Sequence, residues 1–452
     1  MPYFVDSAII YGDMVVTLII AGVTVLLMAL SVIFKPYLQI KKFHIGLYCL
    51  IALTGAIVIL ATGALPIKDA IHGITENSSV NPIKILALFL SMTLISVFLD
   101  DAGFFEYVAN KIFKIAHGGG IKLFLIMYLS VAVLTVFTSN DIIVLTFTPP
   151  IILFARRAKI SPVPYLIGEF IAANTWSMML VVGNPTNVYI ASGAGISFAE
   201  YFTVMAIPTL FGGLLSLGLL LLLFHRSLTK KTDKSLYTPM PEPTNKQIAI
   251  RKVPLIVSLC HLILCIVLLA VADFIKVEMW LICVISCGSL IVFSLFYGLF
   301  KDKSLSHLFT ALSKAPYELI PFVLSMFIIV LALYKQGVTD IIANAILTGK
   351  ETDALTTGFL SGISANLLNN IPMSVLFEKI TAGQSLHAVY GAIIGSNLGA
   401  FITPIGALAG IMWNKILASH GEKLSFLRFT AYGTIIALPT ILVACLGVML
   451  VL

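Results

Sequence analysis

Charged residues are scarce in this chain. Only 11% of its 452 residues are Asp, Glu, Lys or Arg, whereas a soluble domain carries roughly 25%. Hydrophobic residues make up 59% of the chain, and many windows of about 20 residues contain no charge. This composition excludes an ordinary soluble domain and indicates a protein that crosses a lipid bilayer many times.

Motifs for nucleotide, metal and redox chemistry are also missing. Gly118-Gly119-Gly120 and Gly349-Lys350 lack the residues that would complete a P-loop. There is no zinc-protease motif, no nucleophile elbow and no CxxC pair, and the six cysteines lie in apolar segments, where they serve as small apolar filler. We therefore expect no enzyme activity, cofactor or metal. The net charge of +7 comes from basic loops beside a membrane and does not indicate nucleic-acid binding.

Basic residues set the orientation of the apolar segments. Lys and Arg gather in loops at 35–44, 156–159, 226–252 and 301–314, which we place in the cytoplasm. We expect a multi-pass protein of the cell membrane, embedded in lipid. The predicted spans are residues 14–34, 45–65, 83–99, 164–181, 202–224, 253–272, 279–300, 317–334, 386–413 and 426–452.

Two apolar segments, 121–156 and 354–381, are too short to cross the membrane twice. The second arm of the first has about 14 residues, which reach roughly 21 Å as a helix, against a hydrocarbon core of ~30 Å. The return arm of the second meets Glu378 and Lys379 after seven residues. We expect two re-entrant hairpins that enter from opposite faces, with Glu378 and Lys335 snorkelling to the interface.

Helix breakers interrupt two spans. The first contains Gly183 and Pro185 within 182–187, and the second contains Pro404 and Gly406 within 403–406. Proline removes a backbone donor, so each segment should unwind at membrane depth. The predicted broken helices are 164–193 and 386–418.

The two halves of the chain are related at nearly constant offsets. Asn140 matches Asn369 at an offset of 229, and Asn174 matches Asn397 at 223. The basic loops place equivalent spans in opposite directions, which predicts an inverted repeat. The fold is thus an all-α polytopic membrane protein of residues 1–225, a cytoplasmic linker 226–252, and residues 253–452, each repeat with about five spanning helices and one hairpin. Such repeats are typical of secondary transporters with a midplane site.

Asp141 is the first candidate for coupling chemistry. It follows Ser139 and Asn140 between two uncharged apolar arms. Burial favours the protonated form of a carboxylate, so Asp141 is a proton or cation site; alternatively it caps the helix that follows. Glu169 is the second proton-carrier candidate, against a salt bridge or a position near the inner interface.

Amides and hydroxyls cluster at the hairpin tips and helix breaks, where they suit a small polar solute. For the tip amides, the alternative is that they satisfy the turn itself. The predicted substrate or coupling-ion residues are Ser139, Asn140, Asp141, Asn174, Asn184, Thr186, Asn187, Asn369, Asn370, Ser396, Asn397 and Thr403.

These motifs resemble the arsenite/antimonite efflux permeases, or arsenical pump membrane proteins, of the ion transporter superfamily. The resemblance rests on Ser139-Asn140-Asp141 with Thr148-Pro149, on Asn369-Asn370-Ile371-Pro372, and on 391–399 running into 403–409 and Trp413. It implies proton-coupled export of arsenite, antimonite or a similar small oxyacid, in some members with a cytoplasmic ATPase subunit; a homodimer is also a candidate assembly. The alternative is a sodium- or proton-coupled anion or dicarboxylate carrier, or a sodium/proton antiporter, of the same superfamily.

Overall fold

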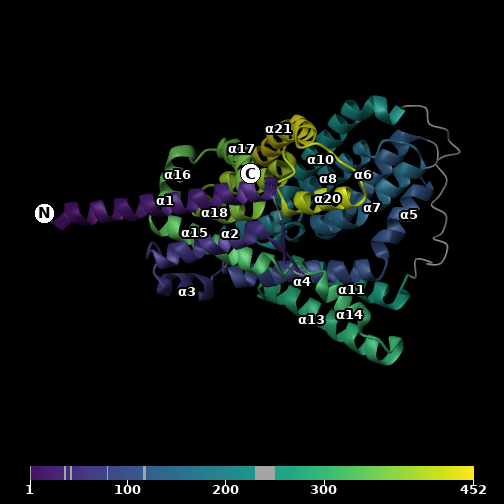
Figure 1. The fold of residues 1–452 in the computed structure, drawn as a ribbon, viewed down its shortest axis with the longest axis horizontal. Helices are drawn as coiled ribbons and strands as arrows, with labels where there is room; N and C mark the ends of the chain where they lie inside the picture. The colour runs from purple at the N-terminus through teal and green to yellow at the C-terminus, as the bar shows by residue number, and fades with distance from the viewer. Residues whose placement is uncertain (1, 35–36, 41–42, 79, 116–118, 230–249) are drawn as a thin grey trace.

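The computed structural model describes residues 2–34, 37–40, 43–78, 80–115, 119–229 and 250–452, and most of the predicted linker lies outside them. Long helices dominate the fold (Figure 1), which confirms the predicted all-α class. The one addition among the described residues is a short antiparallel pair, β1 (Tyr37–Ile40) with β2 (Phe43–Gly46).

The first half of the chain begins with unbroken helices, continues with a hairpin and a divided helix, and ends with the long helix α10. Its helices are α1 (Pro2–Phe34), α2 (Leu47–Ala61), α3 (Ile67–Thr75), α4 (Pro82–Asp101), α5 (Phe104–Ile115), α6 (Gly120–Phe137), α7 (Asn140–Arg157), α8 (Val163–Trp176), η1 (Val181–Gly183), α9 (Pro185–Gly193) and α10 (Phe198–Thr229).

The second half repeats this order. Its helices are α11 (Lys252–Ala270), α12 (Ala272–Ile275), α13 (Met279–Tyr297), η3 (Gly298–Asp302), α14 (Ser306–Ser313), α15 (Leu319–Lys335), α16 (Val338–Ile346), α17 (Asp353–Leu368), α18 (Asn370–Thr381), α19 (Leu386–Leu398), η4 (Gly399–Phe401), α20 (Leu408–Ser419) and α21 (Phe426–Val451).

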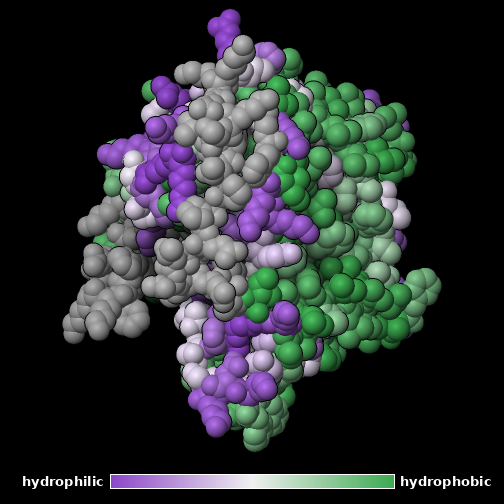
Figure 2. All heavy atoms as spheres, turned by 90° about the vertical axis from the view of Figure 1, so that its right-hand side faces the viewer, coloured by the Kyte–Doolittle hydropathy of each residue, from purple (hydrophilic) through white to green (hydrophobic). Residues whose placement is uncertain are grey.

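Seven helices of the described chain are long and apolar enough to cross a membrane, and the count rises to eight if α15 and α16, bent by 75°, form one span. Leu222, Ile263 and Ile285, on the apolar helices α10, α11 and α13, are exposed to 77%, 60% and 60%, as expected of side chains that face lipid. Figure 2 shows a broad apolar surface beside a polar region that borders the residues drawn in grey. These features support a multi-pass membrane protein.

Helix packing follows the order of the halves. Helix α2 packs on α15 as its counterpart α13 packs on α4, and α7 packs on α20 as α18 packs on α9. Likewise α6 packs on α8 as α17 packs on α19. In each of these three cases, replacing both helices of a packed pair by their counterparts in the other half gives the second packed pair. This pattern supports the predicted repeat, whereas the opposite orientation of its halves in the membrane stays a prediction.

Glycines allow α17 and α19 to approach at backbone distance. Gly391 and Gly395 of α19 and Gly399, which follows its end, lie four residues apart and face Gly358 and Gly362 of α17. A Cβ atom at Gly395 would collide with the backbone oxygen of Gly358. Small residues at this spacing are how membrane helices pack closely, and they fix the first arm of the second hairpin against the second broken helix.

Candidate functional site

The first helix break begins earlier than predicted. Helix α8 ends at Trp176 and α9 begins at Pro185, so the break precedes Pro185, Thr186 and Asn187 instead of containing them. Proline is favoured in the first turn of a helix, and the Asn184 Oδ1 accepts a hydrogen bond from Thr186 N at 3.2 Å as the cap of α9. The predicted unwinding at 182–187 is therefore wrong in its second half.

The second break lies where it was predicted, between α19 and α20. Thr403 donates through N and Oγ1 to the Asn366 Oδ1, at 2.9 and 2.6 Å. The Asn366 Nδ2 donates to the carbonyls of Gly362 and Gly399, both at 2.8 Å. One side chain of α17 thus satisfies backbone groups that the break leaves free.

A buried amide cluster joins the two breaks. The Asn397 Nδ2 donates to the Asn187 Oδ1 at 2.6 Å, and the Asn397 Oδ1 accepts from the Asn184 Nδ2 at 3.0 Å and from the Ser177 Oγ at 3.1 Å. The Asn187 Nδ2 donates to the carbonyls of Ser177 and Leu180. All three asparagines are at most 1% exposed. Their bonding capacity is largely used within the protein.

Two further predicted residues complete this cluster. The hydroxyls of Thr186 and Ser396 lie 3.0 Å apart, which ties α9 to α19 directly. Both side chains are fully buried. The cluster therefore brings together Asn184, Thr186, Asn187, Ser396 and Asn397, from two segments about 210 residues apart in sequence.

The tip of the first hairpin contacts the first broken helix. The Asn140 Nδ2 donates to the Asn174 Oδ1 at 3.2 Å, and the Asn174 Nδ2 donates to the Phe170 carbonyl. The Ser139 Oγ is buried without a hydrogen-bond partner. The tip therefore has a hydroxyl group, that of Ser139, which forms no hydrogen bond with the described residues.

Asp141 adds a charge to that tip. It lies in the first turn of α7 and is partly buried, and its carboxylate forms no hydrogen bond or ion pair with any described residue. A side-chain capping bond from Asp141, the alternative considered above, is absent from the described structure. What remains of that alternative is the favourable field of the helix N-terminus, which acts without a specific bond.

The tip of the second hairpin is strained and pinned. Asn369 has φ 75° and ψ 151°, a region that costs a residue other than glycine about 1–3 kcal/mol. Its Nδ2 donates to the Ile405 carbonyl at 3.3 Å, and Asn370 N donates to the Gly406 carbonyl at 3.0 Å. Asn369 also lines a cavity of about 20 Å³, which holds about one water molecule. The Asn370 side chain forms no hydrogen bond with a described residue and is 3% exposed.

Glu169 is fully buried between α7, α8 and α20. The Thr148 hydroxyl lies 3.0 and 3.1 Å from its two carboxylate oxygens, and the Trp413 indole lies beside it, although Nε1 makes no hydrogen bond of normal geometry. No cation among the described residues pairs with Glu169, and its exposure is 0%. The alternative of a salt bridge is therefore wrong within the described residues, whereas a position near the inner interface stays a prediction.

The snorkelling predicted for Glu378 is also wrong. Its side chain is buried, because α9 covers this end of α18. Lys335, by contrast, is half-exposed and lies 3.6 Å from the Asp69 carboxylate.

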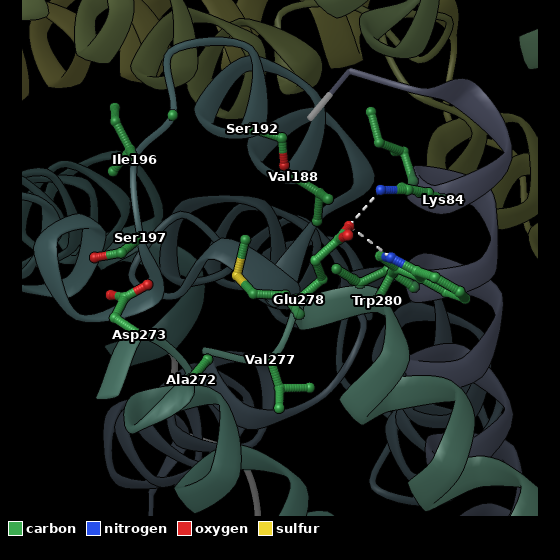
Figure 3. Close-up of a pocket in the computed structure, with 14 residues that line it drawn as sticks. Lys84, Val188, Ser192, Ile196, Ser197, Ala272, Asp273, Val277, Glu278 and Trp280 are labelled. Atoms are coloured by element: carbon green, nitrogen blue, oxygen red, sulfur yellow. Dashed lines mark hydrogen bonds and ion pairs between the residues drawn. The ribbon is translucent and has the colours of Figure 1, made fainter. Parts of the chain in front are cut away.

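A separate pocket of about 220 Å³ lies between α4, α9 and the start of α13 (Figure 3). Lys84 pairs with Glu278 across it, and the Trp280 Nε1 donates to the same carboxylate at 2.8 Å. Val188 and Ser192 of α9 form its opposite wall. None of the predicted site residues lines this pocket.

Sequence reasoning missed two residues that organise the site, Ser177 and Asn366. Asn366 lies three positions before the tip residue Asn369, and a lone amide in an apolar helix is a usable signal. Ser177 carried no signal, since its role depends on Asn397, which lies 220 residues away in the sequence.

Comparisons with known proteins agree with this architecture. Residues 47–389 match the family model described as "Citrate transporter". The "Arsenical pump membrane protein" of Escherichia coli (strain K12) is 27% identical over 443 residues, which cover 94% of this chain and 97% of the relative. The "46 kDa membrane protein" of Mycobacterium leprae (strain TN) is 28% identical over 436 residues, with 93% and 97% covered.

A solved structure shares the fold. The Alcanivorax borkumensis YdaH transporter, whose structure is described as having an unusual topology, superposes with a TM-score of 0.50 at 13% identity and covers 97% of each chain. The resemblance inferred from the hairpin and break motifs is confirmed by the curated relatives. The chain belongs to the citrate transporter family of membrane transporters and is similar over nearly its whole length to the arsenical pump membrane proteins.

Proposed function

We propose that the protein is a proton-coupled secondary transporter that exports arsenite, antimonite or a similar small neutral oxyacid. The observation that carries this proposal is an unpaired carboxylate, Asp141, at a hairpin tip that also holds the unpaired hydroxyl of Ser139. No Lys or Arg occurs in the tips or breaks, residues 138–141, 174–187, 366–372 and 396–407. A site without a cation favours a neutral solute over a dianion, because a buried charge needs a partner.

The predicted site residues divide into two roles. Asn184, Asn187 and Asn397 use most of their bonding capacity on one another and on freed carbonyls, so they hold the breaks open. Side chains with unused capacity at the two tips, Ser139, Asp141 and Asn370, are the groups that contact solute or proton. This division leaves few direct contacts, which suits a molecule with only hydroxyl groups.

Proton coupling would follow from the binding and release of a proton at the Asp141 carboxylate. A proton that binds the carboxylate neutralises it at membrane depth, and a departing proton restores a charge that disfavours the same conformation. Glu169 is the second carrier, held by Thr148. The ATPase subunit and the homodimer stay predictions from the resemblance.

The family match favours one rival, a cation-coupled carrier of citrate or a related anion. Everted membrane vesicles separate the two. We expect a pH gradient with an acidic vesicle lumen to drive the uptake of arsenite and antimonite, and we expect sodium to have no effect on this uptake. Sodium-driven uptake of citrate or succinate with no effect of arsenite would reverse the assignment.

A further inference from the structure

A second buried carboxylate lies far along the return arm of the second hairpin. Glu378 is 4% exposed, and its Oε2 has no hydrogen-bond partner. Among the described residues its cationic partner is its neighbour Lys379, whose Nζ lies 3.2 Å from Oε2 and 3.4 Å from Oε1. A buried carboxylate with so little support is costly to keep charged, so its position calls for an explanation other than packing.

Helix α9 covers this carboxylate with one particular face. Gly193 lies directly against it, since a Cβ atom there would come within 2.8 Å of the Glu378 Oε1. Tyr189 lies one turn earlier on the same face, and its buried hydroxyl has no hydrogen-bond partner among the described residues. The structure thus places an unpaired hydroxyl donor on the helix face that covers Glu378.

The counterpart pair in the other half, α7–α20, also has a buried carboxylate beside it, although this one belongs to the neighbouring helix α8 and accepts from Thr148. The α7–α20 interface meets the buried Glu169, beside which the Trp413 N–H is unpaired, as the α9–α18 interface holds Glu378 and the unpaired Tyr189 hydroxyl. The return arm of each hairpin therefore has, in it or beside it, one buried carboxylate and one N–H or O–H group that lacks a hydrogen-bond acceptor among the described residues. Two independent coincidences of this kind are less economical than one shared role.

We propose that Glu378 is a further proton-binding residue of the transport cycle, in addition to Asp141 and Glu169, and that it is positioned by Tyr189 and Gly193; this rests on the proton coupling proposed above. In the charged state the carboxylate pairs with Lys379 and accepts from the Tyr189 hydroxyl. A proton that binds a carboxylate oxygen breaks the ion pair. Lys379 then keeps its contact with the Tyr334 ring of α15, whose centroid is 5.2 Å away. Protonation thus leaves the Lys379 ammonium with the Tyr334 ring as its partner at the α18–α15 contact.

Other titratable groups on the helices packed around α18 have different surroundings. Lys335 on α15 faces Asp69, and Asp353 on α17 accepts from the backbone of Thr348 and Gly349. Asp340 on α16 and both His387 and Tyr390 on α19 complete the set. Among the described residues, only Lys379 forms an ion pair with Glu378.

Infrared difference spectroscopy tests the proposal without a substrate. Purified protein is titrated with acid and alkali, and the carbonyl band of buried protonated carboxylic acids is followed in H₂O and D₂O. We expect Glu378→Gln to remove one titrating band and Tyr189→Phe to shift it. Gly193→Ala, which displaces the carboxylate, should also shift it. Glu106→Gln, at an exposed carboxylate, is the matched control and should leave the spectrum unchanged.

Transport gives the second readout, in everted vesicles with arsenite as the probe. Glu378→Gln should lower the number of protons moved per arsenite while arsenite exchange persists. The proposal is overturned if the folded variant keeps the band, or keeps the wild-type proton count. Should Glu378→Gln fail to fold, the shift in Tyr189→Phe decides instead. If wild-type arsenite transport moves no protons, the proposed function fails, and the infrared result still judges Glu378.

Discussion

Asn397 donates a 2.6 Å hydrogen bond to Asn187, and this contact joins the two broken helices at the centre of the protein. It is one member of a closed set, because the Asn397 oxygen also accepts from Asn184 and Ser177. The carboxamide of Asn397 therefore links both breaks, together with the Thr186–Ser396 contact.

Removing that carboxamide should destabilise the protein strongly. Asn397→Ala leaves several buried polar groups unpaired, each at a cost of about 1–3 kcal/mol. We expect a lower melting temperature in detergent and reduced recovery as a monodisperse species in size-exclusion chromatography. Asn344→Ala, at an exposed position on α16, is the control. Equal stability of the two variants would show that the cluster contributes nothing.

Asp141→Asn should abolish proton-driven arsenite transport while the protein stays inserted. The amide is nearly isosteric and caps a helix as well as aspartate does, but it does not titrate. Counterflow, which needs no net proton movement, should survive. Transport is measured in vesicles with and without a pH gradient, beside Glu169→Gln. Full proton-driven activity in Asp141→Asn would move the coupling role to Glu169.

A methyl group at Gly395 should separate α17 from α19. Its Cβ atom would meet backbone of Gly358, which cannot rotate away, and overpacking of this kind costs about 1–3 kcal/mol. We expect Gly395→Ala to lower the melting temperature by several degrees and to reduce transport. Gly288→Ala is the matched control, since nothing lies within 4 Å of the added Cβ. The packing argument fails if both variants melt together.

Cysteines at Arg157 and Thr352 should label from opposite sides of the membrane. Both positions are exposed, at the end of α7 and the start of α17. The basic loops place Arg157 inside and Thr352 outside. Cys260, the exposed native cysteine, is first replaced by alanine. Accessibility of both positions to an impermeant maleimide from one face would refute the inverted repeat.

Acid should weaken the contact between Lys84 and Glu278. The hydrogen bond from Lys84 lowers the pKa of Glu278 from its ordinary value of 4.5. A lowered folded-state pKa stabilises the protein above the unfolded value, and this stabilisation is lost as the pH falls through the folded value. Wild-type protein should therefore lose more thermal stability than Glu278→Gln below pH 4.5. The effect is small because Glu278 is mostly exposed. An equal response in Glu351→Gln, at an exposed carboxylate, would make the effect nonspecific.

Much of the architecture was readable from the residues alone. Uncharged segments such as 253–272 leave the bilayer as their solvent, because lipid accepts apolar side chains and excludes charge. Pro404 and Gly406 marked the second break correctly, since proline removes a donor wherever it lies. The polar turns at Asn140 and Asn369 stood out because amides are costly in hydrocarbon.

Only the tertiary structure decided which polar groups remain available. Asn187 donates to the carbonyls of Ser177 and Leu180, so the first break opens at Ser177, before the Gly183 and Pro185 that predicted it. Glu378 looked interfacial by its position, but Gly193 lets α9 cover it. Asn397 and Asp141 are both polar residues of an apolar segment, yet one is saturated and the other is unpaired. Hydrogen-bond saturation depends on partners some 210 residues apart, and no local pattern contains that information.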